Sequence, residues 1–464
     1  MNEELGWLNE QEFGELINRF EKMIKNDHQY FFDVDEFEII IDYYLDTQNF
    51  QFGRKAIEEG LRQHPGTSEF DIRRARLLAY EKKYYEALEL LNHIELLEPT
   101  NDQVYTAKGE IYSMMNKHEL AIKEYKKSIS YSETPEDIYA SIAYEYENMN
   151  DYPQAIKNLK KALKIKPDSE NLIHEIAFFF ELTGRDDEAI QFFTEFLDKN
   201  PYSKVGWFNL GIFYNTLELY EKAIEAYEFT LAIDEEFSSA YFNIANSYSG
   251  LQHYKKAIKY YEKTFEFEAP EPLTYYYIGE SYENMDDLES ALKNFNKAIK
   301  LDDKIGEPWA GSARIAVKQQ QDLKAIKCYE RAILLMPLND DYKYELAVVK
   351  LRNRMFSDAE TLFKEIVEHD STFIEAWINY SVCMNLSASI ETAIDIIEKA
   401  IEKNKDEASL WYRLAGLLYK SGKVQQAYYY IETALKLDFE THAELLEFIP
   451  ELEKESRFIE LLGV

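Results

Sequence analysis

A small residue recurs at every thirty-fourth position along most of the chain. From position 53 to position 427 this column holds eleven alanines and one glycine, and no insertion breaks the phase. Its members are Gly53, Ala87, Ala121, Ala155, Ala189, Ala223, Ala257, Ala291, Ala325, Ala359, Ala393 and Ala427. A constant period of this length indicates an array in which each repeat is one supersecondary unit.

Two columns of larger residues keep the same step. Four residues after each small residue, all twelve positions are apolar or aromatic, and sixteen residues before it nine of twelve are aromatic. Residues spaced i, i+3, i+4 and i+7 share one helical face, and this spacing occurs at Trp207, Leu210, Gly211 and Tyr214. We therefore predict two helices in each repeat, for example over residues 203–217 and 220–232.

Prolines fall between the predicted helix pairs. Five share one phase, twelve residues after the small residue, namely Pro65, Pro99, Pro167, Pro201 and Pro337. Because proline removes a hydrogen bond from a helix interior and clashes with the preceding turn, these positions mark turns between repeats.

The order of these columns resembles the tetratricopeptide repeat, whose pattern is W-x2-L-G-x2-Y followed by alanine, an aromatic residue and proline. The clearest copies are Trp207, Leu210, Gly211, Tyr214, Ala223 and Tyr227, and then Tyr275, Ile278, Gly279, Tyr282, Ala291 and Phe295. The resemblance implies an all-α fold, a right-handed superhelical solenoid of stacked antiparallel helix pairs.

We expect about twelve tandem repeats over residues 34–441. Residues 1–33 are then an N-terminal helical cap and residues 442–464 are C-terminal capping helices, because the last repeat of a solenoid would otherwise expose its apolar face. The alternative is that one of the two ends docks on a partner.

Composition narrows the class of partner. The chain of 464 residues carries 86 acidic and 52 basic side chains, for a net charge of −34. A surface with this much negative charge repels phosphate groups. We therefore expect no nucleic acid partner, and basic proteins are the favoured partners. No run approaches the ~20 apolar residues of a membrane span, which predicts no membrane insertion. With only two cysteines and an acidic N-terminus, the sequence favours a cytoplasmic protein.

Motifs that carry catalysis are missing. No H-E-x-x-H pair, phosphate-binding glycine loop or G-x-S-x-G element occurs. Cys328 fits a core position beside Tyr329, and Cys383 has no periodic histidine neighbour. We therefore predict a protein that is not an enzyme and that needs no cofactor or metal.

The resemblance implies that the concave face, lined by the first helix of each repeat, holds a peptide or protein. Positions between the apolar columns of that helix are the candidates for this groove, namely Phe208, Asn209, Ile212, Asn215, Phe242, Asn243, Asn246, Tyr276, Tyr277, Glu280 and Asn379. Asn209, Asn243 and Asn379 share one phase, and an amide row offers donors and acceptors to a peptide backbone. The alternative interpretation is that these amides are ordinary solvated residues.

The function predicted from these observations is a non-catalytic scaffold or adaptor that binds a protein or peptide segment in the groove. The alternative is a regulator whose flexible superhelix responds to a small molecule or short peptide, because each repeat contacts mainly its neighbours.

Overall fold

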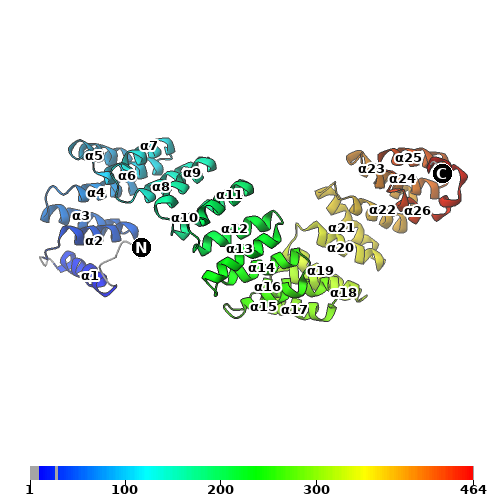
Figure 1. The fold of residues 1–464 in the computed structure, drawn as a ribbon. Helices are drawn as coiled ribbons and strands as arrows, with labels where there is room; N and C mark the ends of the chain where they lie inside the picture. The colour runs from blue at the N-terminus through cyan, green and yellow to red at the C-terminus, as the bar shows by residue number, and fades with distance from the viewer. Residues whose placement is uncertain (1–9, 27–29, 463–464) are drawn as a thin grey trace. The chain divides into compact units, whose positions relative to one another are not determined.

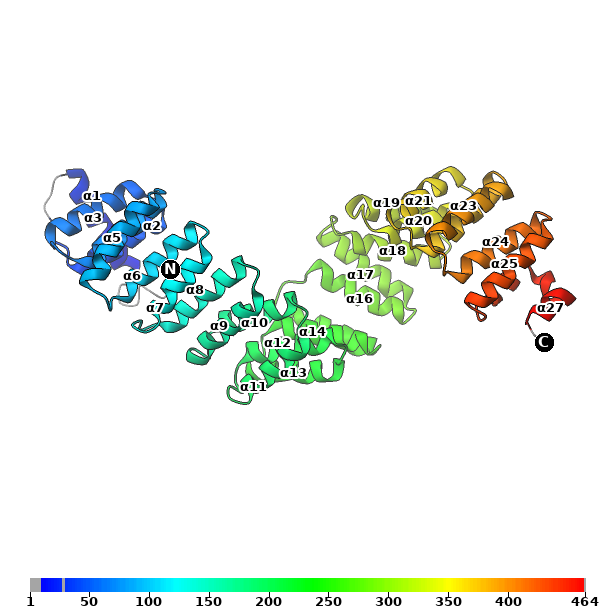
Figure 2. The ribbon, with the colours of Figure 1, turned by 90° about the horizontal axis from the view of Figure 1, so that it is seen from above.

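Helices make up all of the regular structure that is described. The computed structural model describes residues 10–26 and 30–462, and within them there are 27 α-helices and one short 3-10 helix, η1. The chain divides into two compact units, residues 1–235 and 236–464. Figures 1 and 2 show the helices following one another in pairs within each unit. The predicted all-α fold of stacked helix pairs is confirmed.

Unit 1 contains thirteen of the described helices. Their bounds are α1 Glu10–Asn26, α2 Val34–Asp46, α3 Phe50–Gln63, α4 Ser68–Tyr80, α5 Tyr84–Leu97, α6 Asp102–Met114, α7 His118–Ser128, α8 Pro135–Asn148, α9 Tyr152–Ile165, α10 Glu170–Leu182, α11 Asp186–Leu197, α12 Lys204–Thr216 and α13 Tyr220–Ile233. The pair α12 and α13 lies within one residue of the predicted ranges.

Unit 2 contains the remaining described helices. Their bounds are α14 Ser238–Gly250, α15 Tyr254–Thr264, α16 Pro272–Asn284, α17 Leu288–Leu301, α18 Gly306–Lys318, α19 Asp322–Leu335, α20 Asp340–Arg352, α21 Phe356–His369, α22 Ile374–Ser387, α23 Ile390–Lys403, α24 Ala408–Lys420, α25 Val424–Leu437, α26 His442–Phe448, η1 Pro450–Lys454 and α27 Ser456–Leu462.

Glycines of the first helix, which belong to a different column from Ala223, allow an aromatic ring of the second helix to pack between paired helices. A methyl group built on Gly211 of α12 would lie 2.5 Å from the ring of Tyr227 on α13. The equivalent group on Gly279 of α16 would lie 2.7 Å from Phe295 on α17. Both distances are too short for two carbon atoms that are not bonded to each other. Glycine therefore allows these rings to pack against the backbone of the first helix.

Tryptophans in the first helix of a pair form hydrogen bonds with the loop that precedes this helix. The indole nitrogen Nε1 of Trp207 donates to the carbonyl oxygen of Pro201 at 2.9 Å. Trp309, Trp377 and Trp411 make the same bond to the carbonyl six residues earlier, at 3.1, 3.0 and 2.9 Å. The aromatic column therefore does more than fill space, because its indoles satisfy backbone carbonyls in the turns between repeats.

The turn between the two helices of a pair uses one left-handed residue at a constant phase. Most of these residues are not glycine, and the set is Gln48, Lys82, Asn116, Asn150, Gly184, Glu218, Gln252, Asp286, Gln320, Arg354 and Gly422. The remaining position in this phase is Ala388, whose φ is −126° where α22 ends. A left-handed backbone suits glycine best, so the array accepts local strain at nearly every turn.

Both ends of the described chain pack against neighbouring helix pairs. Leu16, Ile17 and Phe20 of α1 are buried in one cluster with Phe37 and Phe70. At the other end, Leu445, Ile449, Leu452 and Phe458 join the core of α24 and α25. These contacts fit capping helices, but the predicted boundaries at 33/34 and 441/442 stay a prediction. Residues 1–9, 27–29 and 463–464 of the two predicted caps lie outside the described residues.

Overpacking the small column should destabilise the fold. Ala223 of α13 is fully buried, so Ala223→Leu forces extra methylene groups into a filled space and should cost ~1–3 kcal/mol. Lys256→Gln changes an exposed side chain of α15 and should cost less than ~0.5 kcal/mol. Urea unfolding followed by circular dichroism compares the two variants, and equal midpoints would contradict the column assignment.

We expect one carboxylate, Glu455, to make the C-terminal packing sensitive to pH. Tyr419 and Tyr428 both donate hydrogen bonds to Glu455, and these bonds lower the pKa of its carboxyl group. The resulting stabilisation should be present above the ordinary carboxyl pKa of about 4.3 and lost as the pH falls through the lowered folded-state value.

Glu455→Gln tests this dependence. Hydrogen exchange of residues 450–462 should show tighter protection at pH 6 than at low pH in the parent chain, and the variant should lack most of that difference. Glu453→Gln, at an exposed neighbouring position, is the control and should behave as the parent chain does. A parent-like pH profile in Glu455→Gln would show that another group controls the docking.

Candidate functional site

The predicted groove residues of unit 1 lie on α12, and the structure gives them unequal exposure. Asn209 is only 5% exposed, and its Nδ2 donates to the carbonyl oxygen of Val205 at 2.8 Å. Phe208 packs against Tyr227 with ring centroids 5.7 Å apart. One amide hydrogen of Asn209 is thus bonded within its own helix. A ligand on this face would contact the residues next to Asn209 more readily than Asn209 itself.

The other two residues predicted on α12 are more accessible than Asn209. Ile212 and Asn215 are both partly exposed. They follow Asn209 by three and six residues, which corresponds to about one and two turns of the helix.

The predicted residues of unit 2 on α14 and α16 form an aromatic cluster. The Phe242 ring stands edge-on to Tyr261 and Tyr277, with centroids 5.4 and 5.7 Å apart. Tyr277 stacks on Tyr261 at 5.9 Å and 13°. The structure therefore brings Phe242 and Tyr277 together, and it adds Tyr261 of α15, which follows Ala257 by four residues and so belongs to the column of apolar and aromatic residues.

The polar members of this cluster bond mainly to one another. Tyr261 Oη donates to Asn246 Oδ1 at 2.6 Å, and Asn246 Nδ2 lies 3.5 Å from Asn243 Oδ1. Tyr276 Oη donates to Glu280 Oε1 at 2.6 Å. Burial raises the pKa of Tyr276, and the bond to Glu280 raises it further. These groups are already organised by internal bonds.

Asn379 lies further along unit 2, on α22. Its Nδ2 donates to Tyr344 Oη at 2.8 Å and to the carbonyl oxygen of Glu375 at 3.2 Å. It contacts α20 rather than the α14–α16 cluster, so the shared phase with Asn243 places equivalent residues in different surroundings.

A depression that the sequence analysis did not predict lies in unit 1 over α2, α4, α6 and α8. Its volume is about 870 Å³. We call it the acidic hollow, and it is lined by Asp35, Glu38, Ile39, Asp42, Leu45, Asp46, Arg73, Arg76, Tyr80, Asp102, Gln103, Thr106, Glu110, Met114, Ser132, Thr134, Asp137, Ile138 and Ser141. Seven carboxylates and two guanidinium groups are present, so negative charge dominates.

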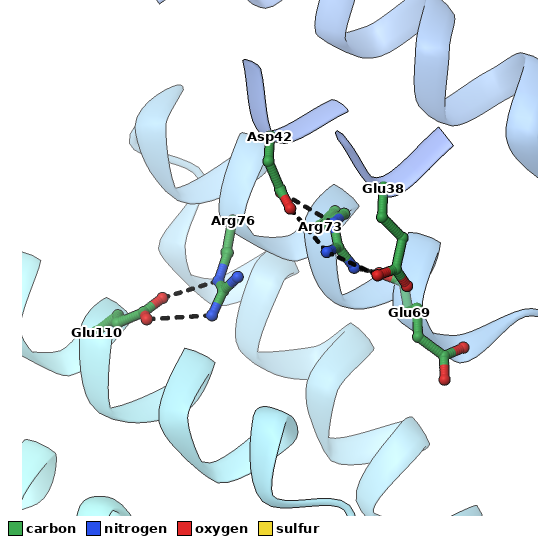
Figure 3. A network of polar contacts seen from close by, with 6 residues as sticks. All are labelled: Glu38, Asp42, Glu69, Arg73, Arg76 and Glu110. Atoms are coloured by element: carbon green, nitrogen blue, oxygen red, sulfur yellow. Dashed lines mark hydrogen bonds and ion pairs between the residues drawn. The ribbon is translucent and has the colours of Figure 1, made fainter. Parts of the chain in front are cut away.

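Arg73 anchors one side of the acidic hollow. Its Nε and Nη2 donate to Asp42 Oδ1 and Oδ2 at 2.9 and 2.7 Å, and Nη2 also reaches Glu38 Oε2 at 3.2 Å (Figure 3). The Arg73 side chain is 8% exposed. Burial raises the pKa of Glu38, although the charge of Arg73 opposes this shift. One buried guanidinium thus holds two carboxylates of α2 in place.

Arg76 makes a second, bidentate pair one helix further along. Its Nε and Nη2 donate to Glu110 Oε2 and Oε1 at 2.9 and 3.1 Å (Figure 3). Burial alone would lower the pKa of Arg76, but Glu110 and Asp42 outweigh it and raise the value. Asp42, Arg76 and Glu110 are successive members of one column with a step of 34, which is the signal that sequence reading could have used.

Four carboxylates of the acidic hollow have no cationic partner within the described part of the chain. They are Asp35, Asp46, Asp102 and Asp137, and they are exposed or partly exposed. The two arginines are already engaged by Glu38, Asp42 and Glu110. These four groups therefore leave an uncompensated negative field over the hollow.

Comparison with known families agrees with the geometry. The family model described as "Tetratricopeptide repeat" matches residues 102–135, 136–169, 206–236, 238–268 and 273–305. This chain carries tetratricopeptide repeats. The five matched segments include α6 to α9 and α12 to α17, and the first of them contributes α6 to the acidic hollow.

Individual relatives of this repeat protein are distant. A curated protein from Sinorhizobium fredii (strain NBRC 101917 / NGR234), "Uncharacterized protein y4yS", is 29% identical over 75 residues, which is 16% of this chain and 41% of that protein. The match thus spans less than half of that relative.

Two solved structures share much of the chain at low identity. The hetero-tetramer Cut9-Hcn1 of APC/C is 13% identical over 88% of this chain and 94% of that one, with a TM-score of 0.43. A tetratricopeptide repeat protein from Parabacteroides merdae ATCC 43184 is 17% identical over 54% and 99% of the two chains, also with a TM-score of 0.43.

Two features are absent from the described residues. None of the helices is both long enough and apolar enough to cross a membrane. In residues 10–26 and 30–462, no three His, Cys, Asp or Glu side chains are arranged to hold a metal ion.

Proposed function

We propose that this chain is a non-catalytic scaffold that binds a basic polypeptide segment in the acidic hollow of unit 1. Tetratricopeptide repeats support protein interaction in general, and the charge of the hollow narrows the partner. The observation that carries the proposal is the excess of seven carboxylates over two guanidinium groups in one depression of about 870 Å³.

The internal ion pairs favour a preformed surface. Arg73 and Arg76 bridge α2, α4 and α6 through Asp42 and Glu110, so these side chains need little reordering when a ligand arrives. Binding costs less free energy when the receptor side chains are already ordered.

The four uncompensated carboxylates set the chemistry of the ligand. Asp35 and Asp46 lie on α2, Asp102 on α6 and Asp137 on α8, so they surround the hollow from different helices. Lysine and arginine side chains along one peptide would each find an acceptor, and the net charge of −34 would speed their approach. An extended segment therefore suits the hollow better than a single basic residue.

The residues predicted on α12, on α14 and α16, and Asn379 on α22 remain our candidates for additional contacts within their own units. Phe242 and Tyr277 offer apolar contact area, and Ile212 is partly exposed. Aromatic side chains are enriched where proteins meet. We also propose that α1 and the segment from α26 to α27 cap the ends of the array.

Fluorescence anisotropy with labelled peptides tests the proposed function. A peptide of alternating lysine and serine should bind the full chain, and raising the salt concentration should weaken the complex because exposed charges are screened. The same peptide with glutamate in place of lysine, and one with serine throughout, should not bind. Equal binding of the three peptides would overturn the proposal.

A further inference from the structure

A small pocket in unit 2 contains a guanidinium group that has no carboxylate partner among the described residues. The pocket has a volume of about 100 Å³ and is lined by Ile378 of α22, by Ser409, Tyr412 and Arg413 of α24, and by Glu444, Leu445 and Phe448 of α26. Most of this lining is apolar, and Arg413 is its one cation.

Arg413 is held in place by weak partners. Its Nε donates to Ser381 Oγ at 3.2 Å, and its guanidinium carbon lies 4.0 Å from the centre of the Phe448 ring. Burial lowers the pKa of Arg413 to about 10, so the group stays charged at neutral pH. These contacts position the planar guanidinium and leave its charge without a counterion in the described residues.

The equivalent arginine of α4, Arg73, has carboxylate partners where Arg413, within the described residues, has none. Arg73 and Arg413 are ten periods of 34 apart and occupy equivalent positions on α4 and α24. Arg73 pairs with Asp42 and Glu38, whereas in the described part of the chain no carboxylate lies within ion-pair distance of Arg413.

A second cation increases the imbalance. Lys420 Nζ lies 3.6 Å from the centre of the same Phe448 ring. Burial lowers the pKa of Lys420, and the charge of Arg413 lowers it further, whereas Glu451 opposes this shift. Two cations share one aromatic ring, which stabilises them less than a carboxylate would.

We propose that this pocket binds one carboxylate group carried on a short apolar chain. The guanidinium offers a planar donor pair to the carboxylate, and Ile378, Leu445 and Phe448 would cover the apolar chain. Glu444 also lines the pocket, and it would repel a doubly charged phosphate more strongly than a single carboxylate. The carboxylate belongs to a small organic acid or to a polypeptide.

Calorimetric titration with butyrate tests the site on the full chain at constant ionic strength. Butyrate should bind and butyramide should not, because the amide lacks the charge. Arg413→Gln should weaken butyrate binding by about tenfold or more, as expected for a lost hydrogen bond to a charged group. Lys436→Gln, an exposed change on α25, is the matched control and should bind as the parent chain does.

A second variant separates loss of the ligand from loss of the fold. Ile378→Phe keeps Arg413 and fills the pocket, so it should also prevent butyrate binding while the circular dichroism spectrum is retained. Equal binding of butyrate and butyramide, unchanged affinity in Arg413→Gln, or no binding of any carboxylate probe would overturn the proposal.

Two peptide probes identify the source of the carboxylate. If N-acetyl-glycyl-leucine binds at least tenfold more tightly than both butyrate and its own amide, the site serves a polypeptide terminus. If N-acetyl-aspartyl-glycine amide binds most tightly, it serves an acidic side chain, and if butyrate does, a small acid. The pocket lies in unit 2 and the acidic hollow in unit 1, so failure of either proposal leaves the other standing.

Discussion

Phe295→Ala should destabilise unit 2 by ~3–5 kcal/mol, the range for removing a buried aromatic ring. The Phe295 ring is fully buried, and a methyl group on either Gly279 of α16 or Gly311 of α18 would lie 2.7 Å from it. The ring therefore fills the space between two successive repeats. With glycine on both sides, neighbouring side chains cannot fill the cavity that alanine would leave.

The measurement must resolve local from global unfolding. Because each repeat contacts mainly its neighbours, an array can unfold in parts, so hydrogen exchange of α16, α17 and α18 should accompany urea unfolding. Tyr429→Ala removes an aromatic ring that is 65% exposed and should cost less than ~1 kcal/mol. If exchange in α16–α18 is no faster in Phe295→Ala than in Tyr429→Ala, Phe295 does not hold these repeats together.

The helix pairs could be predicted because the residues that pack them together recur every 34 positions. Residues of one column make equivalent contacts in different copies, so their phase in the sequence translates into packing. Gly211 with Tyr227 and Gly279 with Phe295 show this correspondence. The hydrogen bond from each tryptophan to a loop carbonyl needed the structure, because its acceptor is a backbone atom that any residue supplies.

The turn between paired helices could not be predicted from composition. Left-handed residues recur with the period of the array, but only two of them, Gly184 and Gly422, are glycines. At the other positions the residue type does not indicate the left-handed conformation. Glu218 and Arg354 adopt it without that advantage, since packing of the flanking helices outweighs the local cost. Ala388 lies at the same phase but is not left-handed. Alanine at this position does not by itself predict that difference.

The candidate surfaces were predicted in part. Phase identified which residues lie on the first helices, but not that the amide of Asn209 turns to its own backbone or that Asn246 accepts from Tyr261. The acidic hollow was missed although Asp42, Arg76 and Glu110 recur in one column, because the charges in this column alternate in sign. Such a column reads as a solvated face until neighbouring helices show that other acids gather around it.

Neutralising the four uncompensated carboxylates should weaken binding of the lysine peptide by about thirtyfold. Each exposed pair contributes about 0.5 kcal/mol, so Asp35→Asn, Asp46→Asn, Asp102→Asn and Asp137→Asn together remove about 2 kcal/mol. Arg73 and Arg76 keep their partners in this variant, which preserves the ion pairs between the helices. Fluorescence anisotropy at several salt concentrations measures both the affinity and its salt dependence.

The control must carry the same change in net charge, because a chain with a charge of −34 attracts any basic peptide to some extent. Glu58→Gln, Glu89→Gln, Asp187→Asn and Glu225→Gln provide it, since these acids are exposed on second helices of unit 1 and lie outside the hollow. If the hollow is the binding site, this control should lose little affinity and the hollow variant should also show a shallower salt dependence. Equal losses in both variants would mean that the peptide responds to total charge, and the assignment of the acidic hollow would be wrong.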